Sequence, residues 1–257
     1  MKRLIKADIY KLQKSRTFWI GFLSVVCLMT AMDFLGVTIV LVGRAEFPSV
    51  GEMSGGAYRI YYSLGTAANY LLYLLPFYLV LFSHDFEYGV VKTAVGNGVV
   101  RRQYLLAKYM STFLATFFVY SVTMIIDMGV NTCLYGFGLQ EEPFLYWKRL
   151  IITLMIQSGL LGGMGCFFLT MRIWVKRSST WIGFYLFFYI GLGSAFIVCD
   201  LHQLPMLKIL PQHWILMSVN NHLFSMRDYF FVGSLIGMLY LLAIMIGLRI
   251  FEKRDLL

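Results

Sequence analysis

Six long apolar runs decide what this chain can fold into. A helix needs about 20 mostly apolar residues to cross the roughly 30 Å of hydrocarbon in a bilayer. The 257-residue sequence contains runs of that length at residues 18–43, 63–83, 110–135, 150–171, 179–200 and 229–250. Only 14% of the residues are charged, against about 25% in soluble domains, so no sizeable soluble domain remains. We therefore expect an all-α membrane protein with six transmembrane helices in a single domain, residues 1–257, and a kink at Pro76 in the second span.

The Lys and Arg residues are distributed unevenly between the segments that connect these runs. Segments 1–17, 84–109, 172–178 and 249–257 hold 16 of the 22, and the alternating segments hold 6. Because basic residues accumulate on the cytoplasmic side of membrane proteins, we expect both termini in the cytoplasm. A chain with a net charge of +9 can bind nucleic acid if its basic residues form a solvated patch. Here the basic residues flank apolar runs instead. Membrane lipid is the expected partner, and nucleic acid is not.

The N-terminal segment, residues 1–17, has an amphipathic pattern. One helical arc carries Leu4, Ile5, Ile9 and Leu12, and the opposite arc carries Lys2, Arg3, Lys6 and Lys14. Such a helix can lie along the inner membrane surface. Asp8 interrupts the apolar arc. We expect an interface helix here, and the alternative is an ordinary basic flank of the first span.

The segment before the last run, residues 201–227, is too short and too interrupted by Pro205 and Pro211 to cross the membrane twice. Irregular backbone at membrane depth survives only where protein or water satisfies it. The high apolar content of the segment therefore favours an external re-entrant hairpin packed on the spans, and the alternative is a plain external loop.

Motifs for catalysis are missing from the sequence. No G-x-x-x-x-G-K-[ST] loop occurs, so ATP hydrolysis by this chain is not expected. The acidic pair Glu141–Glu142 lacks the Arg that a membrane protease of the EExxxR type carries after three intervening residues, since Tyr146 is there. The four Cys and four His residues show no metal-ligand spacing. We expect no catalytic residue, no metal and no cofactor in this chain.

Two carboxylates, Asp33 and Asp127, lie within the first and third apolar runs, toward the side opposite the termini. A charged side chain in hydrocarbon costs about 2.5–3.5 kcal/mol on insertion scales, so each is expected to face protein or a water-filled path. They are candidate residues of a path for cationic cargo. Hydrogen bonding to neighbours such as Asn131 is the alternative.

Residues 84–102, expected in the cytoplasm between the second and third spans, form the most informative stretch. It begins with acidic residues, continues as a short helix whose apolar side contains Val90, Val91, Ala94 and Val95, and stops at Gly96-Asn97-Gly98. Arg101 then opens the next long helix. A merely solvated loop would not need these valines.

This stretch resembles the coupling-helix loop of type-2 ABC exporter permeases. The residues that match the family pattern are Glu87, Gly89, Lys92, Arg101 and Lys108. The ending Phe251-Glu252-Lys253-Arg254-Asp255, the six runs and the interrupted segment before the last run are also similar to that family. Val90-Val91 departs from the more usual Gly-Thr-hydrophobic sequence.

The resemblance implies a membrane subunit driven by a separate cytoplasmic P-loop ATPase that binds ATP and Mg, with two ATPase copies and a second permease copy, as a homodimer, in a bacterial plasma membrane. Val90, Val91, Ala94 and Val95 would then dock in a groove of the ATPase. Small members of this family export antimicrobial or amphipathic peptides, so peptide-like cargo is expected. Export of small drugs or lipid-linked cargo is the alternative, and a membrane-embedded enzyme is the alternative from another class.

Overall fold

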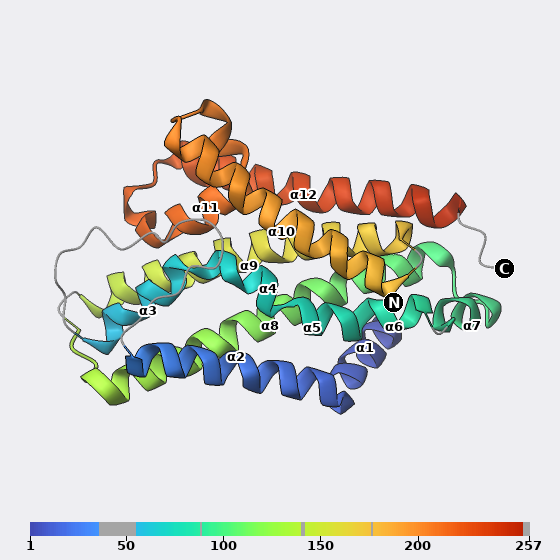
Figure 1. Cartoon of the computed structure of the whole chain (residues 1–257), viewed down its shortest axis with the longest axis horizontal. Coiled ribbons are helices and arrows are strands. Elements are labelled where there is room, and N and C mark those ends of the chain that lie inside the picture. The colour runs from blue at the N-terminus through green and yellow to red at the C-terminus, as the bar shows by residue number, and fades with distance from the viewer. Residues whose placement is uncertain (36–54, 88, 140–141, 176, 254–257) are drawn as a thin grey trace.

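The computed structural model describes residues 1–35, 55–87, 89–139, 142–175 and 177–253, and all regular structure in these ranges is helical. Within these ranges, five helices are long and apolar enough to cross a membrane. They are α2 (Arg16–Leu35), α8 (Arg101–Tyr135), α9 (Pro143–Trp174), α10 (Ser178–Leu201) and α12 (Met226–Lys253). They form one elongated bundle (Figure 1). The expected all-α class is confirmed, and each of these five helices, which have the length and composition of membrane spans, contains most of an expected span.

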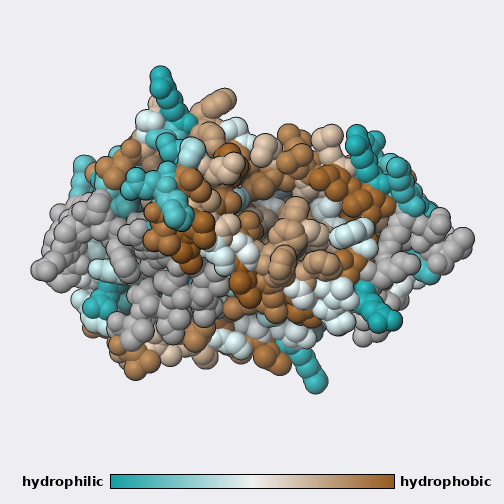
Figure 2. Space-filling view, turned by 45° about the horizontal axis from the view of Figure 1, so that its top comes forward, coloured by the Kyte–Doolittle hydropathy of each residue, from teal (hydrophilic) through white to brown (hydrophobic). Residues whose placement is uncertain are grey.

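The surface of the bundle is divided in the way that a membrane requires. On the face shown in Figure 2, most hydrophilic side chains lie toward the two ends, and hydrophobic side chains occupy much of the middle. Large exposed apolar residues such as Phe118, Phe187 and Leu241 lie on the long helices. Hydrocarbon is the solvent that such a surface suits.

The second expected span, residues 63–83, is not one helix. The described part of the chain between α2 and α8 contains α3 (Gly56–Gly65), η1 (Ala67–Asn69), α4 (Tyr70–Tyr73), α5 (Leu75–Tyr78), the π-helix η2 (Leu79–Ser83), α6 (His84–Glu87) and α7 (Val90–Gly96). In Figure 1 these pieces follow one another from one end of the bundle to the other. The expected break at Pro76 is present, and a second break surrounds Thr66.

The breaks are tolerated because neighbouring helices satisfy the freed carbonyl groups. The side-chain amide of Gln157 on α9 donates to the carbonyl of Leu64 over 3.0 Å. The hydroxyl of Tyr185 on α10 donates to the carbonyl of Leu71. Unpaired peptide groups are costly in an apolar bundle, so these two side chains allow the irregular path.

The N-terminal segment forms the expected helix, α1 (Lys2–Lys14), and Ser15 separates it from α2. Its apolar arc does not face outward as a whole, because Leu12 is buried and Ile9 is exposed. Asp8, which interrupts that arc in the sequence, is also buried. The helix is therefore attached to the bundle through its acidic residue as well as its apolar ones.

Residues 201–227 fold back against α9. The segment contains η3 (Pro205–Ile209), α11 (Pro211–Met217) and η4 (Ser218–Leu223). Gln157 donates to the carbonyl of Ile215 over 2.8 Å, Thr153 donates to that of Ser218 over 3.0 Å, and Asn221 donates to that of Arg149 over 2.9 Å. Trp214, Ile215 and Leu216 are buried. The segment is a packed cap on the bundle and not an extended loop.

Helix α3 begins in close contact with the end of α8. The amide of Gly56 donates to the carbonyl of Gly136 over 2.7 Å, and that of Ala57 donates to the carbonyl of Phe137 over 3.0 Å. A Cβ atom at Gly56 would lie 2.6 Å from the carbonyl oxygen of Asn131 and from the backbone nitrogen of Thr132. Only glycine allows the two helices to approach this closely.

We expect Gly56→Ala to lower stability by on the order of 1–3 kcal/mol, because the added methyl group meets backbone that cannot move aside. Gly129→Ala is the matched control, since Gly129 also lies on α8 but has open space around it. Thermal unfolding of both variants in detergent measures the difference. An equal midpoint for the two variants would contradict the proposed close packing of α3 on α8.

Candidate functional site

Helix α7 lies at one end of the bundle, beyond α6 (Figure 1). Gly89 precedes it with φ +70°, a left-handed conformation that favours glycine. A Schellman motif ends it: Val99 donates to the carbonyl of Ala94 over 3.1 Å, and Gly98, with φ +86°, donates to that of Val95 over 3.0 Å. The two glycine turns thus fix α7 as a short, well-defined helix between α6 and α8.

The apolar side of α7 is divided between the body of the protein and its surface. Val91 is 2% exposed and belongs to the core, and Ala94 and Val95 are half-buried. Val90 is 47% exposed, and Lys92 is also exposed. Of the four residues of the expected docking surface, Val91 therefore attaches α7 to its own chain, and Val90 is the one that is exposed. The side chain of Glu87 lies outside the described part of the structure.

The start of α8 and the end of α12 meet beside this helix. Arg101 donates from Nη1 to the carbonyl of Glu252 over 3.3 Å. The buried ring of Phe251 lies 6.3 Å from the ring of Tyr104, with the two planes nearly parallel, and 6.2 Å from the ring of Phe86. Phe251 and Glu252 are thus in contact with residues 84–102 and the start of α8.

A buried charge network lies next to these rings. The ammonium group of Lys108, on α8, pairs with the carboxylates of Asp8 on α1 and Asp85 on α6, and donates to the carbonyl of Leu81 over 3.1 Å. Lys11 pairs with Asp85 over 2.5 Å, and the hydroxyl of Tyr104 donates to Asp85 over 3.0 Å. Two ammonium groups and two carboxylates thus join three helices that are distant in sequence.

Burial disfavours the charged form of both carboxyl groups, but the balance differs between them. For Asp8, burial outweighs the charge of Lys108 and raises the carboxyl pKa above its ordinary value. For Asp85, burial is outweighed by the combined charges and hydrogen bonds of Lys108 and Lys11, which hold the pKa below its ordinary value. Asp85 is therefore the carboxylate that stays ionised most firmly, and Asp8 takes up a proton first on acidification.

The second group of site residues, Asp33 and Asp127, comes together elsewhere in the bundle. Asp33 lies near the end of α2, and Asp127 lies on α8. Their carboxyl groups face each other. The Ser63 hydroxyl is nearby but outside hydrogen-bonding geometry. Asp127 is only 3% exposed. Among the described residues, no hydrogen-bond donor reaches either carboxylate oxygen of Asp127 or the buried Oδ2 of Asp33. Both residues are candidates from the sequence, and the structure brings their carboxyl groups together.

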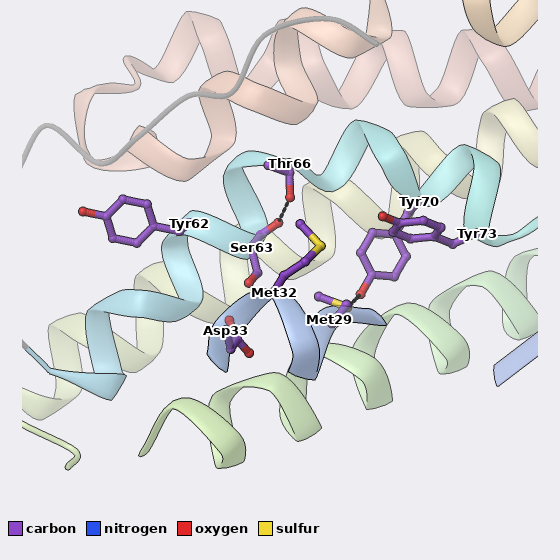
Figure 3. A pocket seen from close by; sticks show the side chains of 8 residues that line it. All are labelled: Met29, Met32, Asp33, Tyr62, Ser63, Thr66, Tyr70 and Tyr73. Atoms are coloured by element: carbon purple, nitrogen blue, oxygen red, sulfur yellow. Dashed lines mark hydrogen bonds between the residues drawn. The ribbon is translucent and has the colours of Figure 1, made fainter. Parts of the chain in front are cut away.

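A cavity of about 40 Å³ lies beside Asp33. Its lining consists of Met29, Met32, Asp33, Tyr62, Ser63, Thr66, Tyr70 and Tyr73. Figure 3 shows Met32 and Ser63 above Asp33, Met29 below the hydroxyl of Tyr70, and Tyr62 extending away from the other side chains. Thr66 donates to the carbonyl of Ser63 over 3.0 Å. The break in the second apolar run thus provides one wall of the cavity.

Sequence reasoning missed two members of the charge network, Asp8 and Asp85. A signal for each was present, since Asp8 interrupts an apolar arc and Asp85 follows directly after an apolar run. A carboxylate in such a position needs a buried cationic partner. The sequence does not identify that partner, because Lys108 is 100 residues from Asp8.

Comparisons with known proteins add no relative to this picture. No protein-family model matches the chain, and no curated protein matches it. The function of the chain is therefore inferred from the geometry of α7, the charge network and the carboxylate pair.

We expect Asp85→Asn to destabilise the protein by about 3 kcal/mol or more, because it leaves the buried Lys108 with only the carboxyl group that ionises less readily. Asp8→Asn, the same substitution on the other side of Lys108, should cost about 1 kcal/mol. Thermal unfolding at pH 7 measures both. Equal losses would contradict the assignment of Asp85 as the firmly ionised partner.

The pH dependence provides a second readout. The native pKa of Asp85 lies below its unfolded value, so its contribution is present at neutral pH and is lost as the pH falls through the native pKa. The unfolding midpoint of the unmodified protein should therefore fall on acidification, and Asp85→Asn should reduce the size of that fall.

Proposed function

We propose that this chain is the membrane-spanning permease subunit of an ATP-driven type-2 ABC exporter in a bacterial plasma membrane, moving peptide-like cargo outward. A separate cytoplasmic P-loop ATPase, in two copies, would bind ATP and Mg and drive a homodimer of the chain. The observation that carries this proposal is α7, a short helix held by two glycine turns at one end of a bundle of potential membrane spans.

The exposure of α7 supports a docking role. A helix that transmits force needs one side fixed to its own protein and another side free for the partner. Val91 provides the fixed side, and Val90, Lys92 and Thr93 are exposed. An exposed valine beside an exposed lysine suits a groove with an apolar floor and an acidic rim.

The charge network supports transmission from α7 into the bundle. Asp85 lies in α6, directly before α7, and pairs with Lys108 on α8. Helix α8 has 35 residues, which at 1.5 Å per residue corresponds to about 50 Å. A displacement of α7 would therefore move a helix that extends along the whole bundle.

The proposed topology follows from the distribution of basic residues. Both termini and α7 would lie in the cytoplasm, with α1 along the inner membrane surface. The broken segment from α3 to η2 would be the sixth crossing, and the packed cap at residues 201–227 would be an external re-entrant hairpin. The contacts of Gln157 with Leu64 and Ile215 support both irregular segments, because they satisfy backbone groups at each.

We expect Val90→Asp to uncouple the exporter, because a carboxylate would enter the apolar part of the ATPase groove. Full-length tagged protein is purified from its host membrane, the P-loop ATPase in the complex is identified by mass spectrometry, and its ATP hydrolysis is measured. Recovery of the ATPase should fall by about tenfold, which corresponds to about 1.4 kcal/mol of docking free energy.

Leu204→Asp is the control for this experiment. Leu204 is also an exposed apolar residue (40%), but it lies between α10 and η3, at the end of the bundle away from α7. The Leu204→Asp variant should leave recovery of the ATPase unchanged. Absence of any P-loop ATPase from the purified complex, or equal recovery with Val90→Asp and with the unmodified chain, would contradict the proposed function. Val91→Asp is unsuitable because it would place a carboxylate in the core of the chain.

A further inference from the structure

Asp33 lines the cavity and Asp127 faces Asp33, and three of their carboxylate oxygens have no hydrogen-bond donor among the described residues. Besides the three carboxylate oxygens of Asp33 and Asp127, the side-chain oxygen of Asn131 is buried and without a partner among the described residues. Asn131 is 1% exposed and lies one turn after Asp127 on α8. Buried acceptors without donors are costly, and a cation with several N–H groups is the chemistry that satisfies them.

Arg59, a cation on the helix that carries Ser63, does not fill this role. Arg59 lies one turn before Ser63 on α3, and its guanidinium group is stacked 3.4 Å from the centre of the Tyr135 ring. The hydroxyl of Tyr135 in turn donates to the backbone carbonyl of Asp33 over 3.1 Å. Within the described part of the chain, no ion pair joins Arg59 to either carboxylate. The charge of Arg59 is directed to an aromatic ring at the edge of the site.

The other walls suit a cation that carries an apolar chain. Met29 and Met32 present polarisable thioethers, and the rings of Tyr70 and Tyr73 form an edge-to-face pair 5.4 Å apart. Aromatic faces attract ammonium groups, and methionine adapts to irregular apolar shapes. The cavity volume of about 40 Å³ exceeds the roughly 10–15 Å³ that one water molecule needs, so a primary ammonium group fits. A trimethylammonium group has no N–H to donate to the carboxylate oxygens.

We propose that this pocket binds the primary ammonium group of a lysine side chain or an N-terminal amine of the cargo, between Asp33 and Asp127. The identification of the ligand as cargo rests on the proposed function. The preference of the pocket for an ammonium group does not, because it is a property of this chain alone.

A shared proton is the competing account of the same geometry. Two carboxyl groups that face each other can lower their repulsion by holding one proton between them. The pocket would then be neutral and would show no preference for a cation over a neutral group of similar size. This difference can be measured directly.

The experiment places a reactive thiol in the pocket by Met32→Cys, in a full-length chain freed of Cys27, Cys133, Cys166 and Cys199. Three methanethiosulfonate reagents are compared: the aminoethyl, the neutral hydroxyethyl and the trimethylammonium-ethyl forms. Relative to its rate with a small free thiol in solution, the aminoethyl reagent should react faster than both the hydroxyethyl and the trimethylammonium reagents. Equal relative rates for the first two, or a faster relative rate for the trimethylammonium reagent, would overturn the proposal.

The carboxylates are then neutralised one at a time in the same background. Asp127→Asn and Asp33→Asn should each lower the ratio of aminoethyl to hydroxyethyl rates by about tenfold, because one opposing charge at contact distance is lost. The hydroxyethyl rate reports whether each variant keeps the pocket, so either variant that keeps it gives the answer. Asp228→Asn, an exposed carboxylate held by Ser225, is the control and should not change the ratio. An unchanged ratio in the pocket variants contradicts the site.

A last arm tests the link to cargo. A synthetic amphipathic peptide of Lys and Leu should protect the introduced thiol, and the same peptide with acetylated lysines should not. Equal protection by both peptides would remove the lysine assignment. Failure of these thiol experiments would leave recovery of the P-loop ATPase untouched, and absence of an ATPase would leave the ammonium preference untouched.

Discussion

The arrangement of this bundle depends on one buried ammonium group. Lys108 lies inside an apolar helix bundle, where an unpaired charge would be prohibitive, and among the described residues its charge is matched by the carboxylates of Asp8 and Asp85. Those two residues come from α1 and α6, so the charge requirement joins the N-terminal helix and the end of the irregular segment to α8. The aromatic contacts of Phe251 then add the end of α12 to the same cluster.

The two polar regions of the bundle differ in charge balance, and α8 belongs to both. Near its start, two ammonium groups are matched by two carboxylates. Nineteen residues after Lys108, at about 1.5 Å per residue, Asp127 on the same helix faces Asp33 without a described cationic partner. A balanced cluster suits a permanent mechanical joint, and an unbalanced one suits a ligand that comes and goes. Under the proposed function, α8 would connect ATPase docking at α7 to the cargo pocket.

Local patterns in the sequence predicted the helical class, five of the long helices, the N-terminal helix and the break at Pro76, because apolar run length and proline chemistry are local properties. They did not predict that Val91 is buried, since a stripe of valines has the same pattern whether it faces a partner or its own core. The meeting of Asp33 with Asp127 depends on packing between distant helices. Asp8 interrupts an amphipathic pattern in the sequence, and in the structure its carboxylate pairs with the buried ammonium group of Lys108.

The proposed function requires that α7 and Glu142, at the start of α9, lie on opposite sides of the membrane, with α7 in the cytoplasm. Single cysteines introduced by Lys92→Cys and by Glu142→Cys, both at exposed described positions, in a chain freed of its four own cysteines, can be tested in intact cells with a membrane-impermeant maleimide. The account predicts labelling after Glu142→Cys, and labelling after Lys92→Cys only once the cells are opened. Labelling after Lys92→Cys in intact cells would contradict the orientation, and with it the docking of a cytoplasmic ATPase at α7.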